Sequence, residues 1–167
     1  MKTKLLVTSL LLTSCAAPAY AVDTPISGSV QTRCLITTDT NGVYGNPLPS
    51  KLSTLAADGG VVPVVRYDVT LADAYLAKVT TPTSFSSSPA LVDSVAWTGS
   101  TTITNTTDVG MAGYEAAKVV YGATTQYDLT VAGSTWFSSE STAVYGVNKS
   151  FVGGSYTALI VAECIAK

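Results

Sequence analysis

The chain has 167 residues, with nine Lys and Arg side chains, eleven Asp and Glu side chains and no histidine. A formal net charge of −2 without a basic cluster argues against nucleic acid and anionic membrane surfaces as partners. Threonine, serine, valine, alanine and glycine dominate, which together with few charges is typical of a single secreted all-β domain.

The first 21 residues have the pattern of a secretory signal peptide. Two lysines precede a short apolar run, and the small residues Ala19 and Ala21 mark a cleavage site after position 21. The apolar run is too short to span a bilayer, and no later stretch approaches a membrane span. As an alternative, the residues that end at Cys15 resemble a bacterial lipobox, which would make Cys15 a lipidated N-terminus. We expect export through a periplasm to the cell surface or the medium.

The first half of the expected domain contains strands and turns. Residues 26–36 alternate apolar and polar side chains, which predicts a strand. Asn41 and Gly42 predict a turn, and Pro47 and Pro49 are expected to end any strand or helix.

The next three segments are less uniform. Residues 51–60 are compatible with a short turn of helix or with an edge strand. Residues 61–71 predict a strand, with Pro63 at an edge or a bulge. Residues 72–79 read as helix or strand, and their β-branched flanks favour a strand.

The second half continues the same punctuation by glycine, proline and asparagine. Residues 91–99 predict a strand that 101–107 could continue, and residues 114–122 could form a short helix or a strand. Further strands are expected in three segments: 125–133, 142–154 (bent, or a hairpin) and 155–166. Seven or eight short strands predict one antiparallel immunoglobulin-like β-sandwich over residues 34–167, preceded by an N-terminal extension over residues 22–33.

Two cysteines remain once cleavage after Ala21 removes Cys15. In an oxidising compartment, Cys34 and Cys164 most simply form one disulfide, although two separate buried thiols are the alternative. Bridged Cα atoms lie about 5.5 Å apart. The bridge would therefore place the last strand beside or across from the first.

Side chains that carry catalysis are scarce. A serine hydrolase needs a base, usually histidine, and the chain has none. No Cys/His cluster or phosphate-binding glycine loop occurs, and the acidic residues are scattered rather than paired as in glycosidases. We expect no enzymatic activity, no cofactor and no metal site.

Three side chains remain to be placed in the fold. Trp97 is expected in the core, and Trp136, between small polar segments, is the candidate exposed aromatic contact. Glu163 is the acid nearest Cys164 and, by alternation, faces the opposite side of the last strand.

The segment ISGSVQTRCLI, residues 26–36, resembles the start of bacterial pilins that are assembled by a chaperone and an usher. Those pilins begin with an extension that alternates around a glycine and leads into a strand with a cysteine. Their incomplete immunoglobulin-like fold receives its missing strand from the next subunit. In many of them the cysteine pairs with another a few dozen residues later, whereas here the partner lies at the far end of the chain.

The resemblance implies a structural subunit of an extracellular filament, a fimbria, that polymerises by strand donation. Ile26, Gly28 and Val30 are the candidate inward-facing residues of the donor strand. Copies of the chain are the expected partners, together with a periplasmic chaperone and an outer-membrane usher. The alternative is a secreted or surface-anchored adhesin module that binds carbohydrate or protein.

Overall fold

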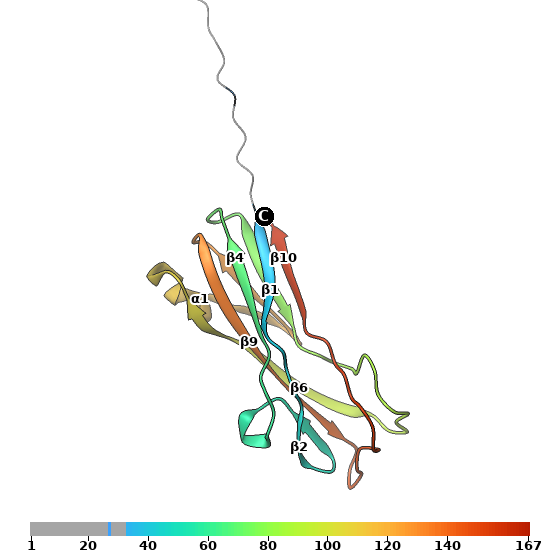
Figure 1. Ribbon diagram of the computed structural model, residues 1–167. Coiled ribbons are helices and arrows are strands. Elements are labelled where there is room, and N and C mark those ends of the chain that lie inside the picture. Colours follow the sequence, from blue (N-terminus) through green and yellow to red (C-terminus); the bar gives the residue numbers. More distant parts are fainter. Residues whose placement is uncertain (1–26, 28–32) are drawn as a thin grey trace, which may run out of the picture. The chain divides into compact units, whose positions relative to one another are not determined.

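The computed structural model describes Ser27 and residues 33–167. Within residues 33–167, ten strands form two antiparallel sheets that pack face to face, as the sequence predicts (Figure 1). The predicted signal peptide, the lipidation candidate Cys15 and the donor residues Ile26, Gly28 and Val30 lie outside the described residues.

The first sheet is built around its longest strand. In the order β1-β4-β9-β3-β2, β9 pairs on one side with β4 and β3, and β6 pairs with its other side. Its strands are β1 (Cys34–Thr40), β2 (Gly45–Leu48), β3 (Lys51–Ser53), β4 (Val64–Val69), β6 (Val95–Thr106) and β9 (Gly133–Tyr145).

The second sheet has the order β10-β5-β8-β7, so β10 and β7 are its edges. Its strands are β5 (Tyr75–Thr80), β7 (Val119–Tyr121), β8 (Thr124–Leu129) and β10 (Val161–Ala166). Three short helical segments connect strands: η1 (Ala56–Asp58), η2 (Val109–Gly113) and α1 (Tyr114–Ala117).

The hydrophobic core lies between the sheets and is built from alternate residues of the strands. Tyr67, Tyr127 and Phe137 are almost completely buried, and the Phe137 ring packs on both tyrosine rings at centroid distances of 5.2 and 4.6 Å. Around Phe137 the space between the sheets is filled by large side chains. Farther along β9 the inward-facing residues are the small, buried Ser139 and Ser141.

Two of the segments for which the sequence allowed either a helix or a strand contain both. Residues 51–60 contain strand β3 and then the turn η1, and residues 114–122 contain helix α1 and then strand β7. Residues 72–79 fall largely in strand β5, as favoured, and residues 91–107 form one continuous strand, β6, from Val95.

The prediction that Pro47 ends a strand is wrong, because β2 includes it. β2 is an edge strand that pairs with β3 through an irregular register between Gly45 and Leu48. Proline is tolerated there because an edge strand leaves one row of backbone groups unpaired.

The strand order has one open position. In an immunoglobulin domain, strands A, B, E and D form one sheet and C, F and G the other. Here β1, β4, β9 and β6 follow the order A-B-E-D and β10 and β5 follow the order F-C, but β8 and β7 extend the second sheet beyond β5. The place of strand G, beside the free edge of β10, is not filled by any strand of residues 33–167.

Candidate functional site: an open groove between the sheet edges

The edge of the first sheet at β1 has unpaired backbone groups. The carbonyl oxygen of Arg33 accepts a hydrogen bond from the Thr70 amide, which identifies the residues of β1 that bond to β4. Because hydrogen-bonded and non-bonded pairs alternate, the backbone groups of Cys34, Ile36 and Thr38 point to the free edge.

The edge of the second sheet at β10 follows the same rule. The Lys167 amide donates to the carbonyl oxygen of Ala74, in register with the pairing of β10 and β5. The backbone groups of Ala162 and Cys164 therefore point away from β5. The two free edges, β1 and β10, run side by side on the same flank of the sandwich (Figure 1).

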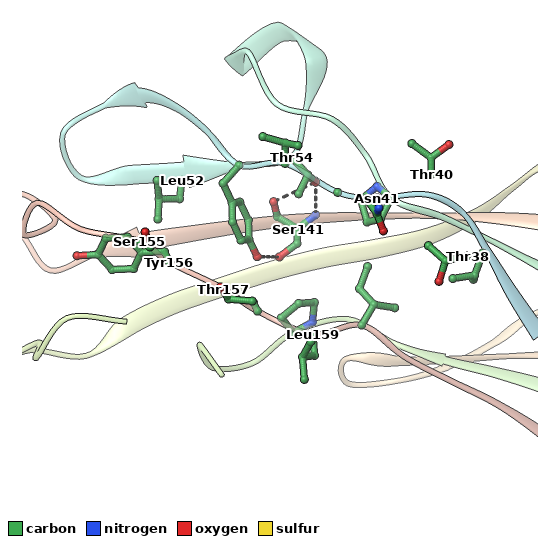
Figure 2. Close-up of a pocket in the computed structure, with 18 of the residues that line it drawn as sticks. Thr38, Thr40, Asn41, Leu52, Thr54, Ser141, Ser155, Tyr156, Thr157 and Leu159 are labelled. Atoms are coloured by element: carbon green, nitrogen blue, oxygen red, sulfur yellow. Dashed lines mark hydrogen bonds between the residues drawn. The ribbon is translucent and has the colours of Figure 1, made fainter. Parts of the chain in front are cut away.

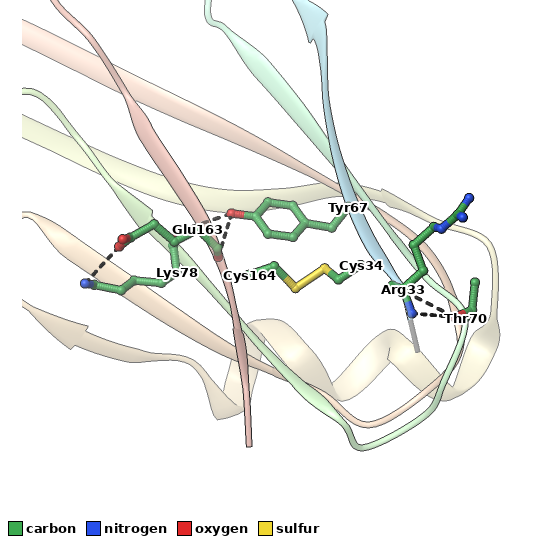
Figure 3. The surroundings of a disulfide bond; sticks show 7 residues. All are labelled: Arg33, Cys34, Tyr67, Thr70, Lys78, Glu163 and Cys164. Carbon is green, nitrogen blue, oxygen red and sulfur yellow. Dashed lines mark hydrogen bonds and ion pairs between the residues drawn. A yellow bond between two sulfur atoms is a disulfide. The ribbon is translucent and has the colours of Figure 1, made fainter. Parts of the chain in front are cut away.

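A disulfide joins these two edges at one end. Cys34 and Cys164 are bonded, with their Cα atoms 6.4 Å apart, which confirms the predicted pairing and places the first strand beside the last (Figure 3). Directly inside the bridge, the buried Tyr67 hydroxyl donates to the carbonyl oxygens of Lys78 and Glu163, at 3.1 and 3.2 Å. Burial raises the pKa of Tyr67 well above its usual range.

Away from the disulfide the edges separate and enclose a cavity of about 580 Å³. One wall is the end of β1 and the turn that follows, from Thr38 to Tyr44, and the other is the segment 154–160 that leads into β10 (Figure 2). The floor is made by inward-facing residues of the first sheet: Leu52, Thr54, Pro63, Val65 and Ser141. We call this cavity with its two walls the groove.

The floor of the groove carries small hydroxyl side chains that are hydrogen bonded to one another. The Tyr44 hydroxyl shares a hydrogen bond with Ser141 Oγ at 3.1 Å. The Thr54 hydroxyl donates to the Ser141 carbonyl oxygen at 3.3 Å and accepts from the Ser141 amide at 2.9 Å. Burial raises the pKa of Tyr44, and its hydrogen bond with Ser141 opposes that shift. The floor is therefore internally satisfied and lined by short side chains.

The wall formed by residues 154–160 is extended but is not part of a sheet ladder. Thr157 exchanges two backbone hydrogen bonds of 2.8 and 3.2 Å with Ser87. Because Thr157 faces Ser87, the backbone groups of Tyr156 and Ala158 point to the other side, toward the open edge. Tyr156, Ala158 and Ile160 are partly buried and line the groove, while Leu159 is 63% exposed.

A cluster of aromatic rings supports this wall at the end remote from the disulfide. The Phe85 ring makes edge contacts with four rings at centroid distances of 4.7–6.4 Å: Tyr44, Trp97, Phe151 and Tyr156. We call these five residues the Phe85 cluster. Tyr44 and Tyr156 belong both to this cluster and to the groove lining.

The tryptophans lie elsewhere than in the main core. The prediction that Trp97 lies in the core is wrong, because Trp97 is only partly buried and packs on Phe85 in the Phe85 cluster. Trp136 projects from the outer face of the first sheet, where it is partly rather than fully exposed and lies 5.8 Å from the Arg66 guanidinium. Glu163 points away from the bridge as alternation predicts and pairs with Lys78 at 2.9 Å.

Most groove residues were not identified from the sequence. The alternation of Tyr156, Ala158 and Ile160 predicts part of a closing strand, and the segment 39–49 predicts a turn, so neither pattern indicates a groove. Period-two alternation indicates which side chains of a strand face inward. It does not show whether a neighbouring strand pairs with that strand.

Other features of the described residues are limited. Among residues 33–167 no group of three His, Cys, Asp or Glu side chains could hold a metal ion, and none of the helices there could cross a membrane. No protein-family model matches the chain, and no curated protein or solved structure matches it either.

Proposed function

We propose that the chain is a structural subunit of an extracellular filament in which an extended segment of one subunit occupies the groove of the next. The observation that carries this proposal is the groove itself, which lies between the free edges of β1 and β10 and has unpaired backbone groups on both walls.

The backbone of the groove suits a strand as its occupant. Tyr156 and Ala158 on one wall and Thr38 on the other present amide and carbonyl groups to an incoming chain. A strand added to an open edge gains main-chain hydrogen bonds, and its alternate side chains fill pockets below. A compact ligand would leave most of these backbone groups unpaired.

The side chains of the groove suit alternate apolar residues. Val65, Ile160 and Leu52 give apolar contacts, while the short side chains at Thr54 and Ser141 leave room above the floor. If the N-terminal extension is a regular strand, its alternation would put Ile26 and Val30 on one face, with Gly28 between them. Burial of each apolar side chain would contribute about 1.5–3 kcal/mol.

The contact is heterologous, because the extension and the groove are different surfaces. Contacts of this kind produce open filaments when the rotation between subunits does not close a ring. An exposed groove before assembly is a hazard, since free strand edges pair with other chains. A periplasmic chaperone that covers the groove and an outer-membrane usher are the partners that such an assembly needs.

The decisive experiment pairs two variants of the full chain. Ile26→Asp/Val30→Asp places charges on the proposed donor face, and Ser27→Asp/Ser29→Asp places the same charges on the opposite face. We expect the first variant to be exported and folded but to form no filaments by electron microscopy, because buried unpaired charges cost several kcal/mol at every junction. The second variant should still assemble. Normal filaments from the first variant would refute strand donation by this segment.

A mixing experiment tests the groove independently. Ala158→Trp should fill the groove, whereas Val161→Trp, at an exposed position of β10 that does not line the cavity, should leave it open. A mixture of the Ala158→Trp and Ile26→Asp/Val30→Asp proteins should form no filaments. Each subunit of a filament needs both an open groove and a working donor segment, and each of these variants lacks one of the two. An equal mixture of the wild-type and Val161→Trp proteins should form filaments.

An adhesin is the second candidate, favoured by the position of Trp136 on the outer face beside Arg66. An aromatic ring on an accessible sheet face is a common platform for sugar stacking or protein contact. If this candidate holds, Trp136→Ala will abolish binding to host-cell glycans or proteins while filament length stays unchanged.

A further inference from the structure

The disulfide lies across the position that a donated strand would take. A strand inserted between two others needs about 4.8 Å on each side, so its neighbours must stand about 9.6 Å apart. At the bridge, the Cα atoms of Cys34 and Cys164 are only 6.4 Å apart. No strand can pass between β1 and β10 at this level.

The cavity begins where this constraint ends. Its lining starts at Thr38 on one wall and at Ile160 on the other, and each residue lies four positions from a bridged cysteine. From Thr38 to Tyr44 the wall has seven residues. At about 3.3 Å per residue, it accommodates about 23 Å of extended chain.

We infer that the Cys34–Cys164 bridge is a depth stop, which limits how far a donated strand of a second copy of this chain extends toward the disulfide and so restricts its register. The inference rests on the proposed function, because it concerns the same groove. The occupant is the segment 26–30 of the second copy, whose five residues fit within the seven-residue wall.

The alternation of apolar residues does not by itself define the register of a donated strand, and a depth stop restricts it. A strand shifted by one residue turns its apolar face to solvent, but a strand shifted by two residues keeps the same face inward. The proposed donor segment alternates over a longer stretch than five residues, since residues 26–36 all follow the pattern. The bridge blocks insertion beyond the cavity and thereby excludes every two-residue shift that would carry the donated strand past Thr38 and Ile160 toward the disulfide.

The experiment is residue-resolved amide hydrogen exchange on the full exported chain carrying Ile26→Asp/Val30→Asp, which leaves the groove free. The probe is a synthetic peptide of residues 22–33. We expect exchange to slow by about tenfold or more at free-edge amides beside the cavity, Thr38, Tyr156 and Ala158. Free-edge amides beside the bridge, Ile36, Ala162 and Cys164, should exchange at the rate of the peptide-free protein.

The outcomes separate this inference from the proposed function. Protection that extends to Ile36 and Ala162 would overturn the depth stop but leave strand donation intact. Protection at none of the six amides would overturn strand donation, and the depth stop with it. A Cys34→Ala/Cys164→Ala variant adds a second measurement: if it folds, protection should advance to Ile36 and Ala162, and an unchanged footprint would show that the bridge does not set the limit.

Discussion

At the residue scale, Tyr67 connects the two sheets at the closed end of the groove. Its ring is fully buried against Phe137 in the core, and its hydroxyl reaches the carbonyl oxygens of Lys78 on β5 and Glu163 on β10. One side chain of the first sheet thus ties together two strands of the second, next to the disulfide.

Removal of this hydroxyl should destabilise the domain. Tyr67→Phe keeps the ring but removes the hydrogen bond that the first sheet makes to the carbonyl oxygens of Lys78 and Glu163, and a hydrogen bond of this kind contributes about 0.5–1.5 kcal/mol. We expect that decrease in the free energy of unfolding by guanidinium titration. The matched control is Tyr121→Phe, at a position 63% exposed, where a change of the same size would argue against the role given to Tyr67.

The raised pKa of Tyr67 also predicts alkaline sensitivity. The unfolded chain loses the phenolic proton near pH 10, whereas the buried hydroxyl keeps it to a higher pH. Between these two pKa values the folded state binds more protons, so the free energy of unfolding falls as pH rises above about 10. Denaturant titrations from pH 8 to 11 should show this fall, and Tyr67→Phe should reduce its slope.

At the element scale, the segment 154–160 is a wall supported by rings rather than by a ladder. Only Thr157 pairs through its backbone with Ser87, so the position of the wall depends on the contacts of Tyr156 within the Phe85 cluster. Strand β9 shows the complementary feature on the floor. Its inward residues change from Phe137 to Ser139 and Ser141, and the short side chain of Ser141 leaves room above the floor of the groove.

Loss of the central ring of this cluster should loosen the wall. Phe85→Ala removes four aromatic contacts, and since Phe85 is only partly buried we expect a cost of about 2–3 kcal/mol, below the range of a fully buried phenylalanine. Trp97 fluorescence should shift to longer wavelength in the folded variant, because Phe85 covers its ring. Val92→Ala, at a position 90% exposed, is the control that should change neither quantity.

At the scale of the whole molecule, one covalent bond closes almost the entire described chain. The bridged cysteines are 130 residues apart and join the first strand of one sheet to the last strand of the other. The groove therefore has one closed and one open end, and a strand that fills it must lie in the open part.

The bridge should also contribute strongly to stability. Cys34→Ala/Cys164→Ala opens a loop with a sequence separation of 130 residues, and the chain-entropy argument predicts a loss of up to about 5 kcal/mol. We expect a lower denaturation midpoint with an unchanged far-UV spectrum at low denaturant. A variant as stable as the wild type under oxidising conditions would show that the unfolded chain is already restricted without the bond.

The fold class, the pairing of the cysteines and the inward face of the final strand could all be predicted from the sequence, because each depends on short-range alternation or on a count of residues. With only two cysteines left after the expected cleavage, Cys34 has one intramolecular partner, and Glu163 must face away from Cys164 if the strand is regular. The position of the groove, by contrast, follows from contacts between segments that are distant in the sequence. The groove exists because β1 pairs with β4 and not with β10. The short side chain of Ser141 leaves room at its floor, and Phe85 supports the wall 154–160 through its contact with Tyr156. These contacts join segments that are up to about 100 residues apart in the sequence. The alternation within one strand does not specify which other strand pairs with it.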